Sequence, residues 1–188
     1  MSLGLATKKT FAAEFTAMIH EMPFEKIRVN ALCERCGADR RTFYYHFYDK
    51  YDLVSWIFLQ DYHASQEGQK SYSLEQNIQM MSKMYGKREF YRAVYSDHSQ
   101  NAIRNYIYQY FYRAGEEALK AKEGIETLPV ETDYALRAYT YACIDLTFEW
   151  LKGDLPYTPD QLALLQFRSM PKELKSAYGV TEESYEYN

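Results

Sequence analysis

The residues best suited to chemistry in this sequence form a short run at positions 40–50, which reads Arg-Arg-Thr-Phe-Tyr-Tyr-His-Phe-Tyr-Asp-Lys. With about 100° between successive residues of a helix, Phe43 and Phe47 share one face and can pack on other helices. Arg41 and Tyr45 then lie on the opposite face, where a guanidinium and a phenol can contact the base edges and phosphates of DNA. The other candidates for DNA contact are Arg28, Arg40, Thr42, Tyr44, His46 and Lys50.

The alternative interpretation of this run is an aromatic-rich, solvated helix in an ordinary helical bundle. An exposed Tyr45 beside Arg41 is unusual for such a helix, because solvated faces favour Glu and Lys. The residue types therefore favour a helix that reads DNA. Lys50 would begin the next helix, where its ammonium and the free N–H groups of the first turn can hold a phosphate.

The distribution of charge indicates which part of the chain an anionic partner would meet. The full sequence of 188 residues has a net charge of −4 at pH 7. Residues 1–50 contain eight Lys or Arg and six Asp or Glu, a net charge of +2, whereas residues 51–188 have a net charge of −6. We therefore expect DNA to bind the N-terminal quarter and to be repelled by the remainder.

Composition and missing motifs argue against several other classes of protein. The chain has 47% hydrophobic residues but only 8 Gly and 5 Pro, which disfavours a β-sandwich or barrel with many turns. No apolar run approaches the roughly 18 residues of a membrane span, and the N-terminus lacks the apolar segment of a signal peptide, so we expect a cytoplasmic protein. Because G-x-S-x-G, P-loop, dinucleotide-binding and H-E-x-x-H motifs are missing from the sequence, we expect neither an enzyme nor a cofactor.

Cys33 and Cys36 form a C-x-x-C motif, for which two interpretations remain. The motif could be a redox pair or half of a zinc site, but no second C-x-x-C or H-x-x-x-H in the sequence completes a set of metal ligands. The other interpretation, which the sequence favours, is two small apolar residues on one face of a short helix. Three cysteines also form no disulfide framework, which fits a reducing compartment.

Hydrophobic periodicity predicts an all-α chain of about nine helices, with no convincing strand. The first helix ends before Pro23, because proline cannot continue it. Two short helices on either side of a turn at Gly37 then have the arrangement of a helix-turn-helix. The predicted helices are residues 7–21, 29–36, 40–47, 50–66, 73–85, 88–95, 99–122, 131–152 and 158–170.

Two later helices begin with the pattern of a capping box. Ser73 with Gln76, and Thr158 with Gln161, can each exchange hydrogen bonds between side chain and backbone across the first turn. After Pro171 the chain is polar and aromatic, and this tail is expected to be frayed.

Residues 7–56 resemble the N-terminal DNA-binding domain of the TetR family of transcriptional regulators. The resemblance is carried by Pro-Phe-Glu-Lys-Ile at residues 23–27, by the Gly37 turn and by residues 41–53. The sequence departs from the family at Arg28, where members usually have Thr or Ser; Arg28 could replace the phosphate contact of that residue but not its helix cap. The resemblance implies that the DNA-contact positions of the family are occupied here by Thr42, Tyr44, Tyr45, His46 and Lys50.

The later part of the chain resembles the C-terminal domain of a Firmicutes-type branch of this family that includes dihydroxyacetone kinase regulators. The matching residues are Phe90, Tyr91, Gln100, Asn101, Ala102 and the run from Trp150 to Gly153. In the family, the last two long helices form the interface of a homodimer, and the heptad spacing of residues 132–150 independently indicates a face that needs a partner. The seam could instead pack within one subunit, and both uses can coexist. The predicted interface residues are Leu136, Tyr139, Cys143, Leu146, Trp150, Leu162 and Leu165.

The resemblance also implies that the second domain binds a small effector molecule, and the sequence leaves a protein co-regulator open as the alternative. The sequence offers candidates but no motif: Asp145 interrupts an apolar stretch, where a buried carboxylate would need a partner. The favoured alternative is that Asp145 faces solvent or pairs across the subunit interface. The candidate effector-binding residues are His98, Arg104, Tyr141 and Asp145, and no metal ligand is predicted.

These observations predict a DNA-binding domain at residues 1–50 and a regulatory and dimerisation domain at residues 51–188. The resemblance implies a transcriptional regulator, with repression as the expected output, that binds a near-palindromic operator as a homodimer and responds to an effector. The alternative is a helical protein–protein adaptor that keeps the fold without sequence-specific DNA binding. The presence of Arg41, Tyr45 and Lys50 argues against that loss.

Overall fold

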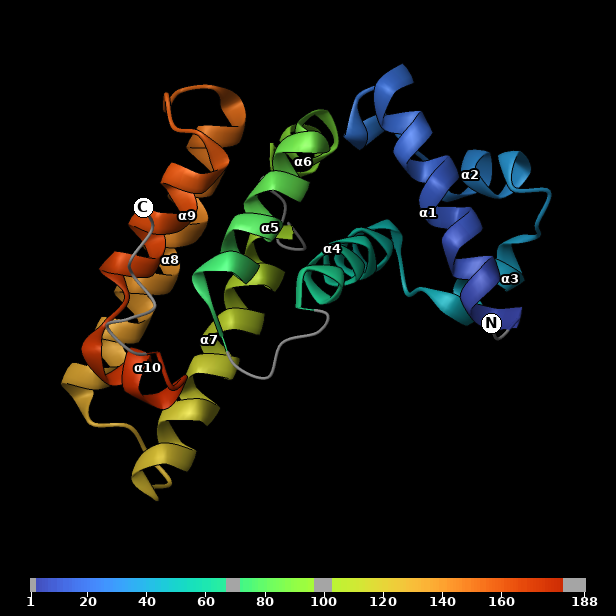
Figure 1. Ribbon diagram of the computed structural model, residues 1–188. Helices are drawn as coiled ribbons and strands as arrows, with labels where there is room; N and C mark the ends of the chain where they lie inside the picture. Colours follow the sequence, from blue (N-terminus) through green and yellow to red (C-terminus); the bar gives the residue numbers. More distant parts are fainter. Residues whose placement is uncertain (1–2, 67–71, 97–102, 181–188) are drawn as a thin grey trace. The chain divides into compact units, whose positions relative to one another are not determined.

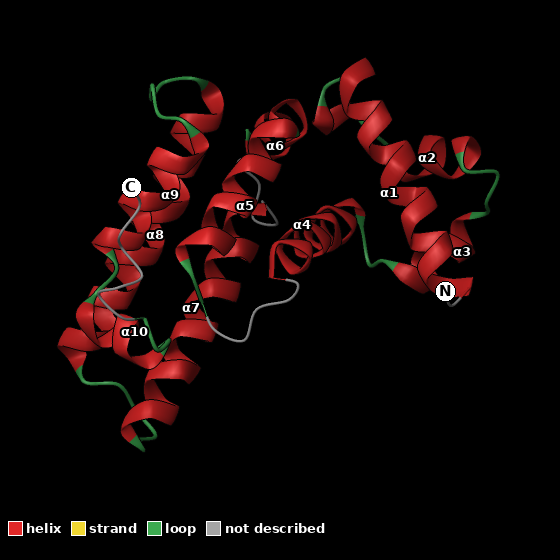
Figure 2. Ribbon diagram, in the orientation of Figure 1, coloured by secondary structure: helices red, strands yellow, loops and turns green. Residues whose placement is uncertain are grey.

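The computed structural model of the chain describes residues 3–66, 72–96 and 103–180, and within these ranges it consists of helices and loops without a strand (Figure 2). The all-α prediction is therefore confirmed for these ranges. No helix within them is long and apolar enough to cross a membrane. In chain order the elements are α1 (Leu3–Glu21), the 3-10 turn η1 (Phe24–Lys26), α2 (Val29–Arg35), α3 (Arg40–His46), α4 (Lys50–Gln66), α5 (Leu74–Gly86), α6 (Arg88–Tyr95), α7 (Ile103–Glu123), α8 (Val130–Lys152), α9 (Pro159–Ser169) and α10 (Lys172–Ala177).

The two ends of the described chain differ from the prediction. α1 begins at Leu3, earlier than the predicted start at Thr7. The expectation of a frayed tail after Pro171 is wrong for Lys172–Ala177, which form α10. Leu174 in this helix is only 3% exposed. Burial of an apolar side chain stabilises a short helix that would be marginal in isolation.

The chain forms two compact units, which are described separately. The units are Met1–Gln60 with Lys87–Asn105, and Asp61–Gly86 with Tyr106–Asn188. The long helices α4 and α7 each contribute residues to both units. The expected division into residues 1–50 and 51–188 concerns function, and its boundary falls at the first residue of α4.

The first unit is organised around the apolar stripe of α1. Phe11, Phe15 and Met18 on this helix are buried. α2, α3 and α6 all contact α1, and Figure 1 shows α1 beside α2 and α3. The ring of Phe11 meets the ring of Phe43 on α3 edge to face, with the centroids 5.3 Å apart. These contacts hold α3 by its apolar side.

The turn between α2 and α3 depends on Gly37, which has a φ of 60°. Its N–H donates to the carbonyl of Glu34 at 3.2 Å, and the N–H of Ala38 donates to the carbonyl of Cys33 at 3.0 Å. This pair of bonds closes α2 in the manner of a Schellman motif. A residue with a β-carbon would be strained at this φ, so glycine fixes the predicted helix-turn-helix geometry.

In the second unit, α9 packs against both α5 and α8 (Figure 1). The capping boxes predicted at the starts of α5 and α9 are both formed. α7 and α8 approach closely at Gly115, where an added β-carbon would lie 2.7 Å from Leu136 Cδ1. Other buried side chains of this core are Met80, Met81, Met84, Phe148, Leu162 and Phe167.

Candidate nucleic-acid interface

α3 exposes an aromatic and a basic side chain on the face opposite its buried anchor. Tyr45 is 84% exposed and Arg41 is also exposed. Phe43 and Phe47, by contrast, are 0% and 2% exposed. The structure thus has the division into a buried and an exposed face that the spacing of these residues predicts.

Contacts at both ends hold α3 in one orientation. Asp39 is the N-cap, and its carboxylate accepts a hydrogen bond of 2.6 Å from the backbone N–H of Thr42. This bond holds the pKa of the Asp39 carboxyl below its usual range, because it stabilises the charged form. At the other end, the ring centroid of Phe47 lies 5.6 Å from that of Phe43 and 6.0 Å from that of Trp56 on α4.

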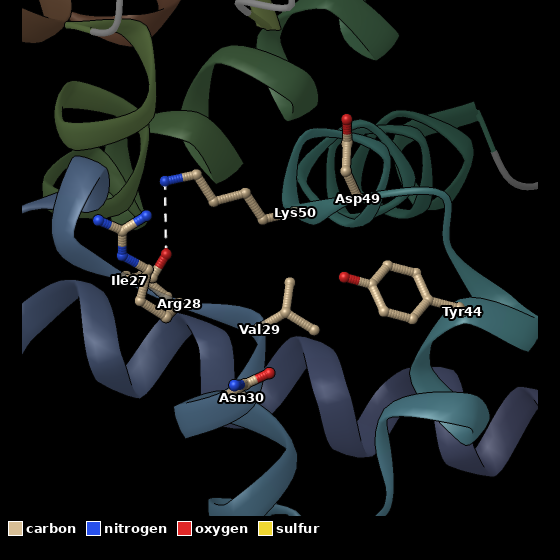
Figure 3. Close-up of a pocket in the computed structure, with 7 residues that line it drawn as sticks. All are labelled: Ile27, Arg28, Val29, Asn30, Tyr44, Asp49 and Lys50. Carbon is tan, nitrogen blue, oxygen red and sulfur yellow. Dashed lines mark hydrogen bonds between the residues drawn. The ribbon is translucent and has the colours of Figure 1, made fainter.

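A pocket with a volume of about 330 Å³ lies beside α3, next to the N-terminus of α2 and the start of α4 (Figure 3). Figure 3 shows the hydroxyl of Tyr44 pointing from α3 toward Val29, with Arg28 and Lys50 beyond it. A phenol, a guanidinium and an ammonium around one pocket are groups that bind phosphate oxygens. The lining residues are Ile27, Arg28, Val29, Asn30, Tyr44, Asp49 and Lys50.

The two helix N-termini at this pocket differ in their capping. Arg28 is the N-cap of α2, and its side chain makes no capping hydrogen bond, as the departure from the family pattern predicts. Asp49 caps α4, because its carboxylate accepts from the N–H groups of Tyr51 at 2.8 Å and Asp52 at 2.9 Å. The first-turn N–H groups of α2 therefore lack a side-chain cap and suit an acceptor such as a phosphate oxygen.

Lys50, predicted to hold a phosphate, makes hydrogen bonds inside the chain. Its ammonium Nζ donates to the carbonyl oxygen of Phe24 at 2.8 Å. The carbonyl oxygens of Glu25 and Ile27 lie 3.4 and 3.5 Å from the same nitrogen. A contact between Lys50 and a phosphate would require the ammonium to leave some of these acceptors.

The other predicted DNA-contact residues of α3 flank its exposed face. Arg40 is exposed, and its guanidinium carbon lies 5.7 Å from the ring centroid of Tyr44. Thr42 and His46 are half-buried. Tyr48, in the loop that follows α3, is 84% exposed. Helical periodicity could not select Tyr48 as a surface residue, because it lies outside the helix.

The C-x-x-C motif lies at the end of α2. Cys33 is buried, and Cys36 is the half-buried C-cap. Burial raises the pKa of the Cys33 thiol and raises that of Cys36 to about 11, so both thiols are protonated at neutral pH. Within the described ranges, no group of three or more His, Cys, Asp or Glu side chains could hold a metal ion. The burial of Cys33 and the raised pKa values of both thiols support the interpretation of two small apolar residues.

The candidate effector-binding residues lie in different parts of the chain. His98 lies outside the described residues. Arg104 belongs to the first unit, whereas Tyr141 and Asp145 lie one turn apart on α8 in the second. The Tyr141 ring is 54% exposed and stacks on the ring of Tyr108, with the centroids 4.0 Å apart. Asp145 is half-buried.

Three of the predicted interface residues are buried inside the chain itself. Leu136, Trp150 and Leu162 are 2%, 3% and 1% exposed. The indole N–H of Trp150 donates to the carbonyl of Tyr157 at 2.7 Å, which satisfies its polar group within the subunit. Leu136 and Trp150 of the heptad seam thus pack within one chain, which is the alternative that the sequence left open.

Two predicted interface residues do lie on the surface. Leu146 on α8 is 42% exposed and Leu165 on α9 is 47% exposed. Tyr139 and Cys143 are half-buried between these helices, where the Tyr139 hydroxyl donates to the carbonyl of Gln166 at 3.1 Å. The exposed leucines are therefore the predicted interface residues that a second chain could cover.

Two family models match the chain. Residues 16–56 match the model described as bacterial regulatory proteins of the tetR family, and residues 73–172 match the model described as transcriptional regulator C-terminal region. Among solved structures, the chain is similar to the dihydroxyacetone kinase operon activator DhaS, with 16% identity and a TM-score of 0.59 over 95% of this chain and 99% of that chain. At this identity the likeness is one of fold. No curated protein matches the chain.

Proposed function

Because this chain belongs to the TetR family of bacterial regulatory proteins, we propose that it is a repressor that binds a near-palindromic DNA operator as a homodimer. The family matches confirm the resemblance stated from the sequence and identify a transcriptional regulator. The proposed binding to a specific DNA operator depends above all on the exposure of Arg41 and Tyr45, opposite the buried Phe43. A tyrosine this exposed gains little from burial in its own chain, so its position is best explained by a partner that covers it.

In the proposed complex, α3 lies in the major groove. One group of residues contacts the bases and a second group contacts the phosphates. Arg41 and Tyr45 contact base edges and thymine methyl groups, and thereby read the sequence. Arg28, Tyr44 and the uncapped N–H groups of α2 bind phosphates beside the pocket, and thereby position the helix. Arg40, Thr42 and His46 flank this surface.

We place the dimer interface on the exposed surface of α8 and α9. Leu146 and Leu165 provide apolar contacts. Ala138 and Ala142, two turns and one turn before Leu146, are exposed small residues that allow a second helix to approach closely. A two-fold dimer would place its two α3 helices in successive major grooves, roughly 34–36 Å apart, which explains why the operator should be near-palindromic.

The regulatory part of the proposal assigns effector binding to residues 51–188 and repression to the DNA-bound dimer. A dimer on its operator excludes other proteins from the DNA that it covers, so repression is the direct consequence of binding. The structurally similar DhaS is named an operon activator, and activation is therefore the competing outcome. A reporter gene behind the operator distinguishes the two by the sign of its response to the protein.

The test of DNA binding is selection of duplexes from a random-sequence pool by the full chain, followed by gel shifts at two salt concentrations. We expect a near-palindromic consensus and a complex that weakens steeply with salt, because phosphate contacts release counterions. An adaptor without sequence-specific DNA binding would give no consensus and no competable complex. That result would contradict the proposal.

A further inference from the structure

Tyrosine side chains from several helices meet within the second unit. Tyr72 precedes α5, and its ring stacks on that of Phe167 in α9 and on that of Tyr178 at the end of α10, with centroids 5.9 and 5.3 Å apart. Tyr62 of α4 meets Tyr110 of α7 edge to face, with the centroids 5.7 Å apart. The phenol cluster is defined here as Tyr62, Tyr72, Tyr110, Tyr139 and Tyr178, together with the thiol of Cys143.

The polar groups of the phenol cluster lie close enough to affect one another. Burial raises the pKa of the Tyr72 phenol well above its usual value, and the nearby thiol of Cys143 and phenol of Tyr62 raise it further. Burial also raises the pKa of Tyr139, to which Tyr72 contributes next. The pKa values of the other members are raised by burial as well. All six groups are therefore uncharged at neutral pH.

The phenol cluster also remains accessible to water. All six of its side chains are half-buried. In the apolar core of the same unit, by contrast, Leu136, Leu162 and Phe167 are 2%, 1% and 0% exposed. Accessible surface on side chains that meet from several helices indicates space between them that water enters. A small molecule can occupy such space by displacing the water.

The chemistry of the phenol cluster favours an uncharged aromatic ligand. Since its six groups are neutral, a charged ligand would lose water without gaining an opposite charge from them. The ring of Tyr72 lies nearly parallel to those of Phe167 and Tyr178, at interplanar angles of 9° and 25°. A planar ligand extends such a stack. The phenol hydroxyls both donate and accept hydrogen bonds, so they suit a hydroxyl or carbonyl group on the ligand.

We propose that the phenol cluster is the ligand-binding site of the second unit, and that it takes a neutral, planar aromatic molecule with a hydroxyl or carbonyl group. This inference rests on the effector binding proposed above for residues 51–188. It replaces the candidates on α8 that the sequence suggested. Tyr141 and Asp145 each lie two residues from Cys143 on this helix, so they belong to its opposite side.

The first test measures the binding of p-cresol to the full chain by calorimetry. p-Cresol is a neutral, planar phenol, whereas methylcyclohexanol is not planar, and p-hydroxybenzoate and tyramine are charged. We expect p-cresol to bind at one site per chain with a Kd of about 1 mM or lower. The three comparison compounds should bind more weakly, the charged ones by about tenfold or more. Binding of tyramine or another comparison compound as tight as that of p-cresol overturns the proposal, and so does the absence of saturable p-cresol binding.

The second test locates the bound p-cresol with variants. Tyr72→Leu and Tyr178→Leu each remove one ring from the stack, and each should weaken p-cresol binding about threefold to tenfold. Tyr141→Leu is the matched control, because it removes a tyrosine of α8 that is 54% exposed, and it should bind p-cresol like the wild type. Normal binding by Tyr72→Leu and Tyr178→Leu overturns the proposal.

The wild-type chain provides a third test, which does not depend on the folding of any variant. Cys143 belongs to the phenol cluster, whereas Cys36, also half-buried, lies at the end of α2 in the first unit. Saturating p-cresol should slow the alkylation of Cys143 by iodoacetamide several-fold and leave that of Cys36 unchanged. Mass spectrometry of the digested protein measures both rates. An unchanged rate at Cys143 overturns the proposal.

Failure of this site can be distinguished from failure of the proposed function. A chain that selects a DNA duplex but fails these binding tests overturns the ligand site alone. A chain that binds p-cresol as expected but selects no duplex supports the ligand site and contradicts the proposed DNA binding.

Discussion

The backbone N–H of Thr42 donates a hydrogen bond of 2.6 Å to the Asp39 carboxylate, which makes an acidic residue the N-cap of the helix proposed to read DNA. A carboxylate at this position satisfies a free N–H group and interacts favourably with the helix dipole. The same negative charge repels nearby phosphates. Asp39 is therefore expected to stabilise α3 and to weaken DNA binding, and substitutions can separate the two effects.

Asp39→Asn should keep the cap and remove the charge. Because Asn caps helices about as well as Asp, this variant should melt close to the wild type and bind random duplex more tightly at low salt. Asp39→Ala removes both cap and charge, and it should melt at a lower temperature. Melting curves and gel shifts measure the two effects. Unchanged DNA affinity of Asp39→Asn would place this carboxylate away from the DNA and contradict the proposed docking.

Arg41→Ala and Tyr45→Ala should weaken binding to the selected duplex more than binding to random duplex. Contacts with base edges are worth roughly 1–3 kcal/mol each, and random sequence does not offer them. Both side chains are exposed, so neither variant should change the melting temperature. Binding titrations on both duplexes give the measurement. If both variants bind the selected duplex like the wild type, the wrong face of α3 has been placed in the groove.

Phe47→Ala is the contrasting variant for the same helix. Phe47 is 2% exposed and its ring contacts those of Phe43 and Trp56. Its removal leaves a cavity beneath α3 and should lower the free energy of unfolding by about 3–5 kcal/mol. Binding to both duplexes should weaken together, because the whole helix loses its support. A selective loss on the selected duplex, with normal stability, would contradict this packing role.

Leu146→Asp and Leu165→Asp should each convert the proposed dimer to monomers. A carboxylate in an apolar interface must lose water without gaining a partner. Monomers should also bind the operator more weakly, because the two half-sites are no longer bound by one linked molecule. Sedimentation at several protein concentrations measures the first effect, and gel shifts measure the second.

Two control variants on α8 make the dimer prediction specific. Val130→Asp changes a side chain that is 80% exposed at the start of the helix, and it should leave the dimer intact. Leu136→Asp places a charge at a position that is 2% exposed inside the chain, and it should unfold the second unit. A wild type that sediments as a monomer at micromolar concentration would exclude the proposed interface.

Alkaline pH should destabilise the second unit through phenols and a thiol that are buried or half-buried. Burial raises the pKa of Tyr112 and Tyr178 from the usual 10.0 to about 12, and it raises the pKa of Cys143 from 9.0 to about 12. Folding therefore favours the protonated forms of these groups. Their contribution to stability is fully present below about pH 9 and is lost as the pH rises through about 12.

The expected observation is a melting temperature that falls between about pH 9 and 12, together with tyrosinate absorbance that rises late for the buried phenols. Tyr178→Phe should remove one late-titrating phenol from the absorbance curve. The substitution keeps the ring that stacks on Tyr72, with centroids 5.3 Å apart in the wild type, so it should fold normally. A curve in which all tyrosines ionise together in the folded chain would contradict the burial described here.

Local features of both units could be predicted from the sequence. The spacing of Phe43 and Phe47 against Arg41 and Tyr45 defines two faces of α3, because the rotation per residue is a property of the helix alone. Capping signals act across three residues, and they located the starts of α5 and α9 for the same reason. Gly37 marked its turn, since few other residues adopt a positive φ.

Only the tertiary structure decided what covers each face. The heptad seam marks Trp150 as apolar, but the ring that stacks on it, Tyr85, comes from α5. Lys50 has the charge expected of a residue that binds phosphate, yet its ammonium donates a hydrogen bond to the carbonyl of Phe24, 26 residues earlier in the chain. The predicted frayed tail instead contains the helix α10, because the fold provides the side chains against which Leu174 is buried. Periodicity depends on neighbours in sequence, whereas burial and hydrogen-bond partners depend on neighbours in space.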